Sequence, residues 1–395
     1  STHFQSGREV TAMNERVAIV GAGFTPLRAV SPHASFRELI FEAAVRAYED
    51  AGATPKDVDS FVTVAEDYQD GTCIMDEYTP DQIGAVLRPV QTVSGDGIEG
   101  LGVAWMLVRT GQFPVVLLEG HSKASNVRHP THIEAMALDP SFVRPHAWHP
   151  AFVAGMEMRR YLHDSGTTEA QVARVAAKNR ANALNNPIAA YPARISPEQV
   201  LASRPIADPL RELNTSPSAD GAFVLILAAE SALGRFRGQP VYVDGVAWIC
   251  DTCNLHTRDW GRAAYAEAAA KQAYAEAGVK DPRRDIAFAE VDDTHAYKEL
   301  QHIEALGLAE RGLAGTLLEQ GAFDAGGKLP VNVSGGSLGC GNLFEANPLR
   351  GLYEAVLQLR GHAGARQVPG ARRGLVSSWR GAPAATGGVA VLSGR

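Results

Sequence analysis

Apolar and polar positions alternate along this chain with the two spacings that distinguish strands from helices. The spacing predicts a strand over residues 16–20, a helix over 35–51 and a second strand over 60–64, which together form a βαβ unit. Gly52 directly follows the helix, where a left-handed C-terminal cap is expected. The pattern therefore predicts an α/β protein.

The predicted elements occur twice in the same order. Residues 47–52 (AYEDAG) match residues 273–278 (AYAEAG), and each segment precedes a charged turn and a strand, at 60–64 and at 285–291. Each half continues with a glycine-rich turn, a helix and an apolar strand: turns at 94–97 and 334–342, helices to about 110 and over 349–360, strands over 114–119 and 374–378. Two βαβ-rich halves predict duplicated domains whose sheets are covered by helices on both faces.

One stretch interrupts this duplication and sets the expected domain boundaries. Residues 126–204 are rich in His, Pro and Ala and predict an inserted helical loop domain, of a kind that usually covers a functional site. The boundaries that follow are a tag or disordered lead over 1–12, the two parts of an N-terminal half over 13–125 and 205–240, and a C-terminal half over 241–395.

Composition narrows the class of protein. With 395 residues, of which 45% are hydrophobic, the chain can bury a large core. The formal net charge of −7 is spread without long runs of one sign, which argues against nucleic acid as a partner. The sequence has no signal-peptide pattern and no apolar span of about 18 residues, so we expect a cytoplasmic protein that does not enter a membrane.

Two further patterns suggest ligands but are incomplete. Cys250, Cys253 and His256 resemble half of a zinc site, yet a structural zinc needs four ligands and no second pair follows, so no metal is expected. Residues 21–26 (GAGFTP) imitate a dinucleotide fingerprint, but Pro26 stands where the third glycine belongs, and the second strand begins only near residue 60. We therefore do not expect NAD binding.

Two motifs carry a resemblance to a known family. Residues 215–222 (TSPSADGA) resemble C-S-P-V-S-D-G-A and residues 332–336 (NVSGG) resemble N-P-S-G-G, while residues 299–308 and 368–371 fit the same family. From Arg16 onward the chain resembles the thiolase superfamily, in the branch of archaeal acetoacetyl-CoA thiolases and sterol-carrier-protein-type thiolases. The resemblance implies duplicated αβαβα layers, with two mixed sheets, helices between and outside them, and a helical loop insertion.

The nucleophile of that family is the cysteine of C-A-S-G, at the start of a helix whose dipole and N–H groups stabilise a thiolate. Counting back from the strand that carries residues 115–118 and Lys123 places Ser94-Gly95-Asp96-Gly97 on this motif. Ser94 therefore holds the nucleophile position, and a serine hydroxyl needs a general base in reach. The alternative role of Ser94 is that of a small residue in a tight strand-to-helix turn.

Two histidines supply the acid–base groups of the family, one in E-V-H-D and one in G-H-P. Here residues 290–293 read EVDD and residues 341–343 read GNL, so Asp292 and Asn342 replace the histidines. An Asp can accept a proton and an Asn amide can hold a developing oxyanion, which are the demands of enolate chemistry. Both residues also suit helix capping, which is their purely structural alternative.

These changes exclude the usual thiolase route. The chain resembles a subgroup that has lost the thiolase residues and cleaves carbon–carbon bonds in acyl-CoA thioesters by retro-aldol chemistry, as in steroid side-chain degradation; that subgroup has tyrosines at the two histidine positions. The resemblance implies a carbon–carbon lyase (acyl-CoA aldolase) for β-hydroxyacyl-CoA, with CoA as part of the substrate and no bound cofactor. It also implies a homodimer, which we expect to pair through the strand over 114–119, and a small DUF35 partner with an OB-fold and a zinc ribbon.

Two other functions stay open. Ser94 could carry the acyl group of an acyltransferase or Claisen-type enzyme, with His146 or His149 of the insertion as base, or the chain could be a non-catalytic scaffold of a thiolase-like complex. Cys340 is either a second thiol nucleophile or a buried small residue. The remaining site candidates are two catalytic residues, His295 and Tyr297, and four substrate-contacting residues, Gly335, Gly336, Cys340 and His149.

Overall fold

The computed structural model describes residues 15–381 and 385–394, so the lead expected over residues 1–12 lies outside the described residues. The strands are β1 (Val17–Phe24), β2 (Ser60–Val64), β3 (Val90–Val93), β4 (Val115–Lys123), β5 (Pro205–Ala207), β6 (Leu210–Arg211), β7 (Asp220–Ala229), β8 (Val241–Cys250), β9 (Phe288–Glu290), β10 (Arg373–Ser377) and β11 (Thr386–Ser393). The helices are α1 (Phe36–Ala51), α2 (Pro80–Ile83), α3 (Gly97–Arg109), α4 (Pro130–Met136), α5 (Pro150–Ser165), α6 (Glu169–Asn182), α7 (Pro197–Leu201), α8 (Ala264–Ala277), α9 (Pro282–Asp285), α10 (Ala296–Ala305), α11 (Ala314–Glu319), α12 (Gly336–Cys340) and α13 (Asn347–Arg360).

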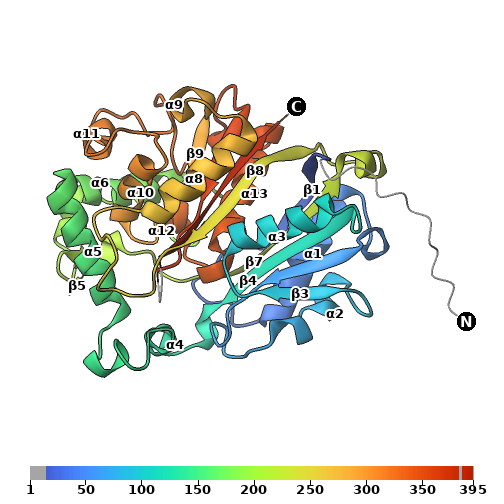
Figure 1. The fold of residues 1–395 in the computed structure, drawn as a ribbon, viewed down its shortest axis with the longest axis horizontal. Helices are drawn as coiled ribbons and strands as arrows, with labels where there is room; N and C mark the ends of the chain where they lie inside the picture. The colour runs from blue at the N-terminus through green and yellow to red at the C-terminus, as the bar shows by residue number, and fades with distance from the viewer. Residues whose placement is uncertain (1–14, 382–384, 395) are drawn as a thin grey trace, which may run out of the picture.

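Among the described residues, nine strands form one mixed sheet in the order β3-β2-β4-β7-β1-β8-β11-β10-β9. The first five strands come from the N-terminal half and the last four from the C-terminal half, and the two halves occupy opposite sides of the molecule (Figure 1). They meet where Ala18 pairs with Tyr242 and Ile19 with Val241. The predicted α/β class is thus confirmed, and the two expected sheets are joined edge to edge by this short contact.

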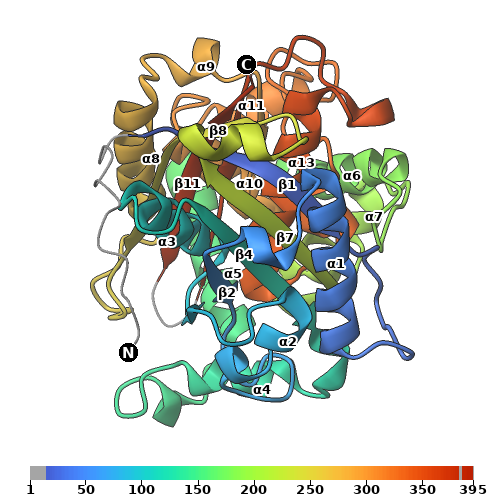
Figure 2. The same cartoon turned by 90° about the vertical axis from the view of Figure 1, so that its right-hand side faces the viewer.

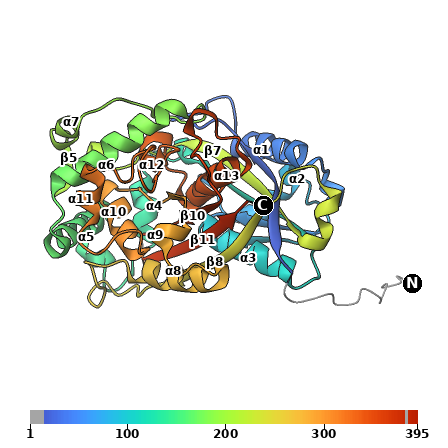
Figure 3. The same cartoon turned by 90° about the horizontal axis from the view of Figure 1, so that it is seen from above.

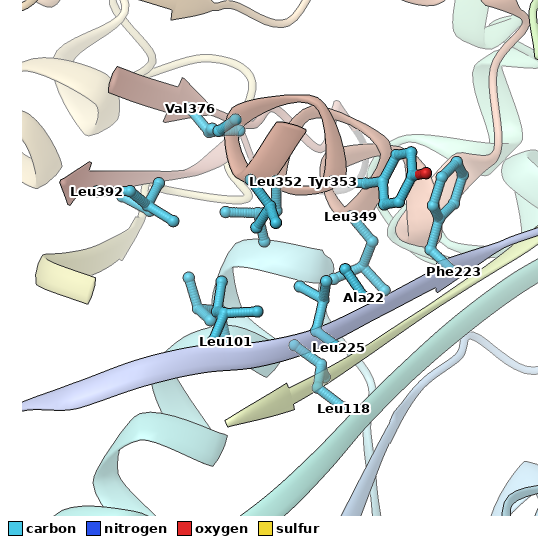
Figure 4. Packing of buried hydrophobic residues seen from close by; sticks show 14 of the residues in the cluster. Ala22, Leu101, Leu118, Phe223, Leu225, Leu349, Leu352, Tyr353, Val376 and Leu392 are labelled. Atoms are coloured by element: carbon cyan, nitrogen blue, oxygen red, sulfur yellow. The ribbon is translucent and has the colours of Figure 1, made fainter. Parts of the chain in front are cut away.

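The largest apolar core lies between the two halves, around α3 and α13. Leu101 of α3 and Leu352 of α13 meet side chains from both halves of the sheet, among them Leu118 of β4 and Val376 of β10 (Figure 4). Side chains in such a layer are packed as densely as in organic crystals, so the two helices have little freedom to shift. The core therefore fixes where α3 and α13 begin, which is beside the candidate site.

Strand alternation assigns the two faces of the sheet. In β4, Val116 and Leu118 face the central layer, whereas Val115 and Leu117 pack against α1 on the outer face. In the second half, α8 and α10 contribute to the core on the other outer face. Helices therefore lie both between and outside the strands, as two views of the molecule show (Figures 2 and 3).

The duplication extends to single contacts. A Cβ atom on Gly21 of β1 would lie 2.6 Å from the carbonyl oxygen of Ala47 in α1, and one on Gly245 of β8 would lie 2.3 Å from that of Ala273 in α8. Ala47 and Ala273 occupy matching positions in the two repeated hexapeptides. Each outer helix thus approaches its strand at a glycine, so Gly21, part of the apparent dinucleotide fingerprint, is a packing position.

The segment between β4 and β5 carries α4 to α7, and its long helices α5 and α6 lie against the C-terminal half (Figure 1). Met158 of α5 and Val172 of α6 share an apolar core with Leu300 of α10 and Leu338 of α12. This segment is thus anchored on the two helices that border the candidate site. Over residues 15–381 and 385–394, no helix has the length and apolar character required to cross a membrane.

Strand β4 corrects one expectation about assembly. The strand over residues 114–119 was expected to pair across a two-fold axis, but Leu117 of β4 pairs with Phe61 of β2 on one side and with Ile226 of β7 on the other. Both edges of β4 are occupied within the chain, so this expectation is wrong. At the N-terminal end the sheet stops at β3.

Candidate active site

Ser94 lies in the turn between β3 and α3. Asp96 is the N-cap of α3, where its Oδ1 accepts hydrogen bonds from the backbone N–H of Ile98 (2.8 Å) and Glu99 (3.2 Å), so Ser94 stands two residues before the cap. Ser94 is exposed, and its carbonyl oxygen accepts a hydrogen bond from Arg380 Nη1 at 2.9 Å. Over the described residues no histidine hydrogen-bonds to the Ser94 hydroxyl. The general base that a serine nucleophile needs is therefore not in place.

Asp292 follows β9 in the loop that leads to α10. Its Oδ1 accepts from the Thr294 N–H at 3.0 Å and its Oδ2 from the Thr294 hydroxyl at 3.3 Å, while α10 itself is capped at His295. Burial, reinforced by the neighbouring Asp293 carboxylate, raises the pKa of Asp292 to about 7. A carboxyl group with this pKa exchanges a proton readily at neutral pH, which suits a general base or acid.

Asn342 has a fixed amide orientation. It follows Gly341, which ends α12 with φ at +104°, and its Oδ1 accepts a hydrogen bond from the Phe344 N–H at 2.9 Å. Because the carbonyl end of the amide is engaged, the Nδ2 end is the one that can donate to a ligand. A donor held in this way can stabilise a developing oxyanion.

One loop holds the Asp292 and Asn342 segments together. In the T-S-P-S motif before β7, the Ser216 N–H donates to the Thr294 carbonyl at 2.8 Å, and the Pro217 carbonyl accepts from the Asn342 N–H at 2.8 Å. The motif that carries the sequence resemblance is thus the physical bridge between the two candidate catalytic segments. It brings residues that are 50 positions apart in the chain to one place.

His295 connects Asp292 to the region of Ser94. Its Nδ1 lies 3.2 Å from the Thr215 hydroxyl, and its ring meets the edge of the Trp379 ring at 5.8 Å between centroids. Burial, together with the Lys298 ammonium, lowers the pKa of His295 to about 3, so the imidazole is neutral at pH 7. Trp379 directly precedes Arg380, which binds the Ser94 carbonyl. These contacts place Ser94, His295 and Asp292 in one region.

Tyr297 lies deeper in the protein than the other candidates. Its side chain is fully buried, and its hydroxyl donates to Glu157 Oε2 of α5 at 2.8 Å. Burial, reinforced by the Glu157 carboxylate, raises the pKa of Tyr297 well above its usual range. The hydroxyl is therefore engaged with the insertion.

Cys340 is buried at the end of α12. Its thiol donates to the Ser334 carbonyl at 3.1 Å, and burial raises its pKa to about 12. A thiol with this pKa stays protonated at neutral pH and is a poor nucleophile. The contacts therefore favour the role of a buried small residue.

The remaining substrate-contact candidates are held by packing and capping contacts. A Cβ atom on Gly336 would lie 2.0 Å from Asp293 Oδ2, because the Asp293 carboxylate accepts hydrogen bonds from the first turn of α12. A Cβ atom on Gly335 would lie 2.6 Å from the Ala183 side chain. His149 is exposed and caps α5, so its role as a substrate contact stays a prediction.

Three residues of this region were not found from the sequence. Asp96 carried a signal, because an Asp between glycines directly before an apolar helix is an N-cap pattern. Burial raises the pKa of Asp96, and hydrogen bonds, foremost that from Ser378, oppose this shift. Trp379 and Arg380 carried no signal, because Arg380 reaches Ser94 across 286 positions of sequence.

Metal ligands do not gather in the part of the chain that the structure describes. Over residues 15–381 and 385–394, no group of three or more His, Cys, Asp or Glu side chains could hold a metal ion. Cys250 and Cys253 are both free thiols at exposed positions.

Both halves of the chain match known protein families. Residues 17–231 match the family described as the thiolase N-terminal domain, and residues 248–394 match the family described as thiolase C-terminal domain-like. An acetyl-CoA acetyltransferase of Methanothermobacter thermautotrophicus is 34% identical, covering 95% of this chain and 98% of that protein.

Two other proteins are similar over nearly their whole length. A 17-hydroxy-3-oxo-4-pregnene-20-carboxyl-CoA lyase of Mycobacterium tuberculosis is 28% identical, covering 94% of this chain and 98% of that protein. The solved structure of the Ltp2-ChsH2(DUF35) aldolase matches with a TM-score of 0.83 at 26% identity, covering 97% of this chain and 99% of that one.

Proposed function

We propose that this chain, which belongs to the thiolase family, is an acyl-CoA aldolase: a lyase that breaks or forms a carbon–carbon bond in a β-hydroxyacyl-CoA thioester. The observation that carries this proposal is the Asp292 carboxyl group, buried and with a pKa raised to about 7, in a segment that the loop over residues 215–218 joins to the Asn342 segment. Ser94, at the nucleophile position of the family, has no histidine bonded to its hydroxyl among the described residues.

The proposed reaction uses one base and one oxyanion donor. Asp292 removes the proton from the β-hydroxyl group, the Cα–Cβ bond breaks, and its electron pair moves onto the thioester carbonyl to give an enolate. The Asn342 Nδ2 group donates to the enolate oxygen, and the proton held by Asp292 then returns to Cα. The products are a ketone or aldehyde and a shortened acyl-CoA, so atoms and charges balance without a cofactor.

The similar proteins favour different reactions for this chain. The lyase of Mycobacterium tuberculosis and the Ltp2-ChsH2(DUF35) aldolase favour carbon–carbon cleavage. The acetyltransferase that is 34% identical favours the alternative, in which Ser94 carries an acyl group. Because a DUF35 protein is named with the aldolase, we also propose a DUF35-type partner for this chain. The homodimer that the sequence resemblance implies is part of the same proposal.

An assay with β-hydroxyacyl-CoA substrates tests the lyase, with the chain alone and with a DUF35-type protein added. We expect release of a ketone or aldehyde, a loss of at least about 100-fold in kcat for Asp292→Asn and about 100-fold for Asn342→Ala. Ser94→Ala is the matched control at the same site and should leave kcat/KM unchanged.

The same reaction mixtures separate the alternatives. Intact-protein mass after exposure to acyl-CoA should show an unmodified chain. A covalent acyl group that disappears in Ser94→Ala would overturn the lyase in favour of the acyltransferase. Full activity in Asp292→Asn would remove Asp292 as the base.

A further inference from the structure

Lys298 occupies an unfavourable place for an ammonium group. Its side chain is 0% exposed, and it stands in the first turn of α10. The N-terminal end of a helix carries a partial positive charge that disfavours a cation, and removal of the ammonium from water adds a further cost. The groups around Lys298 must therefore compensate both effects.

The contacts of Lys298 lead from the insertion to the candidate site. Its Nζ meets four groups: Glu157 Oε1 at 2.8 Å, Gln301 Oε1 at 2.9 Å, the Tyr265 hydroxyl at 3.2 Å and the Trp379 ring centroid at 4.3 Å. The Trp379 ring also contacts His295, so the ammonium and the imidazole share one aromatic neighbour. The Glu157 carboxylate is the one anion in this set.

Glu157 also fixes where the ammonium can lie. It belongs to α5 of the insertion, is 2% exposed, and uses Oε1 for Lys298 and Oε2 for the Tyr297 hydroxyl. Two adjacent residues of α10 are thus held by one carboxylate of α5. Removal of one partner of a buried ion pair strongly destabilises a folded protein, so we expect the Glu157–Lys298 contact to persist in the folded state.

We propose that Lys298 is a positioning residue of this site: Glu157 of the insertion holds its ammonium group over the Trp379 ring that contacts His295, and from there its charge favours the proton-accepting forms of Asp292 and His295. The role in turnover rests on the proposed function, in which Asp292 is the base. The effect on ionisation does not depend on any reaction and is measurable in the resting protein.

The Lys298 ammonium lowers the pKa of both Asp292 and His295, as this role requires. Burial and Asp293 raise the pKa of Asp292, and the Lys298 ammonium lowers it, which favours the carboxylate. Burial lowers the pKa of His295, and the Lys298 ammonium lowers it further, which favours the neutral ring. One cation thus stabilises the proton-accepting form of both groups.

Several other charged or titratable groups lie around Asp292, His295 and Lys298. They are Glu157 on α5, Asp251 and Arg258 between β8 and α8, Tyr265 on α8, Asp293 before α10, and Tyr297 and His302 on α10. Desolvation lowers the pKa of Lys298, Glu157 opposes this shift, and Arg258 adds to it. Glu157 therefore favours the charged form of Lys298.

The test compares the pH dependence of kcat/KM in the wild type, Lys298→Arg and Lys298→Met. Loss of the ammonium leaves only the Thr294 hydrogen bonds to oppose the effect of burial and Asp293 on the pKa of Asp292, and an uncompensated Glu157 carboxylate acts in the same direction as burial. We expect the acid limb in Lys298→Met to move to higher pH by about one unit, a tenfold loss of kcat/KM below the limb. Lys298→Arg keeps the charge and should keep the limb.

Lys178→Met is the matched control. Lys178 of α6 forms an equally buried ion pair with Glu299 of α10, at 3.0 Å, so its removal also breaks a link between the insertion and this helix. It is not among the groups that shift the pKa of Asp292 or His295. We expect a lower Tm without movement of the acid limb, and a limb that moves equally in both variants would overturn the assignment to Lys298.

A readout without turnover separates this inference from the proposed function. The ¹³Cγ shift of Asp292, assigned with Asp292→Asn, reports its ionisation in the resting protein, and it should titrate at higher pH in Lys298→Met. Unchanged titration overturns the inference, whereas a shift in a protein without lyase activity supports it and removes the function. Lys298→Gln, which keeps hydrogen-bond donors for Glu157, replaces Lys298→Met if that variant does not fold. Failure of both to fold overturns the inference by assigning Lys298 to stability.

Discussion

The three positions that carry catalysis in the thiolase family have different surroundings in this chain. Ser94 is exposed and bound through its carbonyl, Asp292 is buried with a raised pKa, and Asn342 has one end of its amide engaged. A simple exchange of cysteine for serine would require a base beside the hydroxyl. The groups suited to proton transfer lie instead around Asp292, which favours enolate chemistry over an acyl-enzyme.

The raised pKa of Asp292 predicts that this residue destabilises the protein at neutral pH. The folded-state pKa of about 7 exceeds the ordinary aspartate value of 3.8, so the folded state binds a proton more tightly than the unfolded state does. The stability contributed by that proton is present below pH 4 and is lost as the pH rises to about 7.

Asp292→Asn removes this pH dependence while it removes the base. We expect the variant to gain stability relative to the wild type, with a gain about 2 kcal/mol larger at pH 8 than at pH 5.5. Urea unfolding at the two pH values measures the difference and cancels effects of the amide that do not depend on pH. An equal gain at both values would show that the folded state does not bind the Asp292 proton more tightly than the unfolded state does.

Sequence reasoning located residues that lie within motifs and missed those that act across the fold. Asp292 and Asn342 were predictable because each replaces a residue inside a recognisable string. Lys298, Trp379 and Arg380 were not, because their roles depend on contacts with distant segments: Lys298 with Glu157 of the insertion, Trp379 with His295 and Lys298, and Arg380 with Ser94. Such contacts exist only once two halves and an insertion have packed together.

At the scale of whole elements, the local spacing of apolar residues was sufficient to locate individual strands and helices. The strand predicted over residues 60–64 is β2, and the helix predicted over 35–51 differs from α1 by one residue. The neighbour of a strand is not a local property, and for that reason β4 was wrongly expected at a dimer interface. The repeat identified the duplicated layers because both halves bury the same pattern.

The duplicated close approaches of strand and helix can be tested one half at a time. Gly21→Ala forces a Cβ atom against Ala47, and Gly245→Ala forces one against Ala273, so we expect each to cost about 1–3 kcal/mol of unfolding free energy. The contacts lie in separate halves, and the double variant should lose the sum.

Gly234→Ala is the control for these two variants, because a Cβ atom there meets nothing within 4 Å. Denaturant unfolding should show no loss of stability for this substitution. A full loss from Gly21→Ala with none from Gly245→Ala would mean that the second half accommodates the methyl group, contrary to the duplicated contact.

At the scale of the whole molecule, the two edges of the nine-stranded sheet differ. At the C-terminal end, Ala289 of β9 is bridged by Val331, so that edge is covered. At the other end β3 has β2 on one side, and Val86 and Leu87 just before it are 55% and 102% exposed. An uncovered edge strand flanked by exposed apolar residues invites pairing with another chain.

We therefore predict that two copies pair antiparallel through β3 across a two-fold axis, which continues the sheet from one copy into the other. Val86→Asp and Leu87→Asp place charges beside that edge and should convert a dimer into a monomer in light scattering coupled to size exclusion. Val30→Asp is the matched control, since Val30 is exposed to 57% and lies in the segment between β1 and α1, outside the β3 edge. A wild-type monomer, or a dimer that survives both edge substitutions, would contradict pairing at β3. Because Ser94 directly follows β3, loss of the dimer with loss of lyase activity would further show that the site depends on assembly.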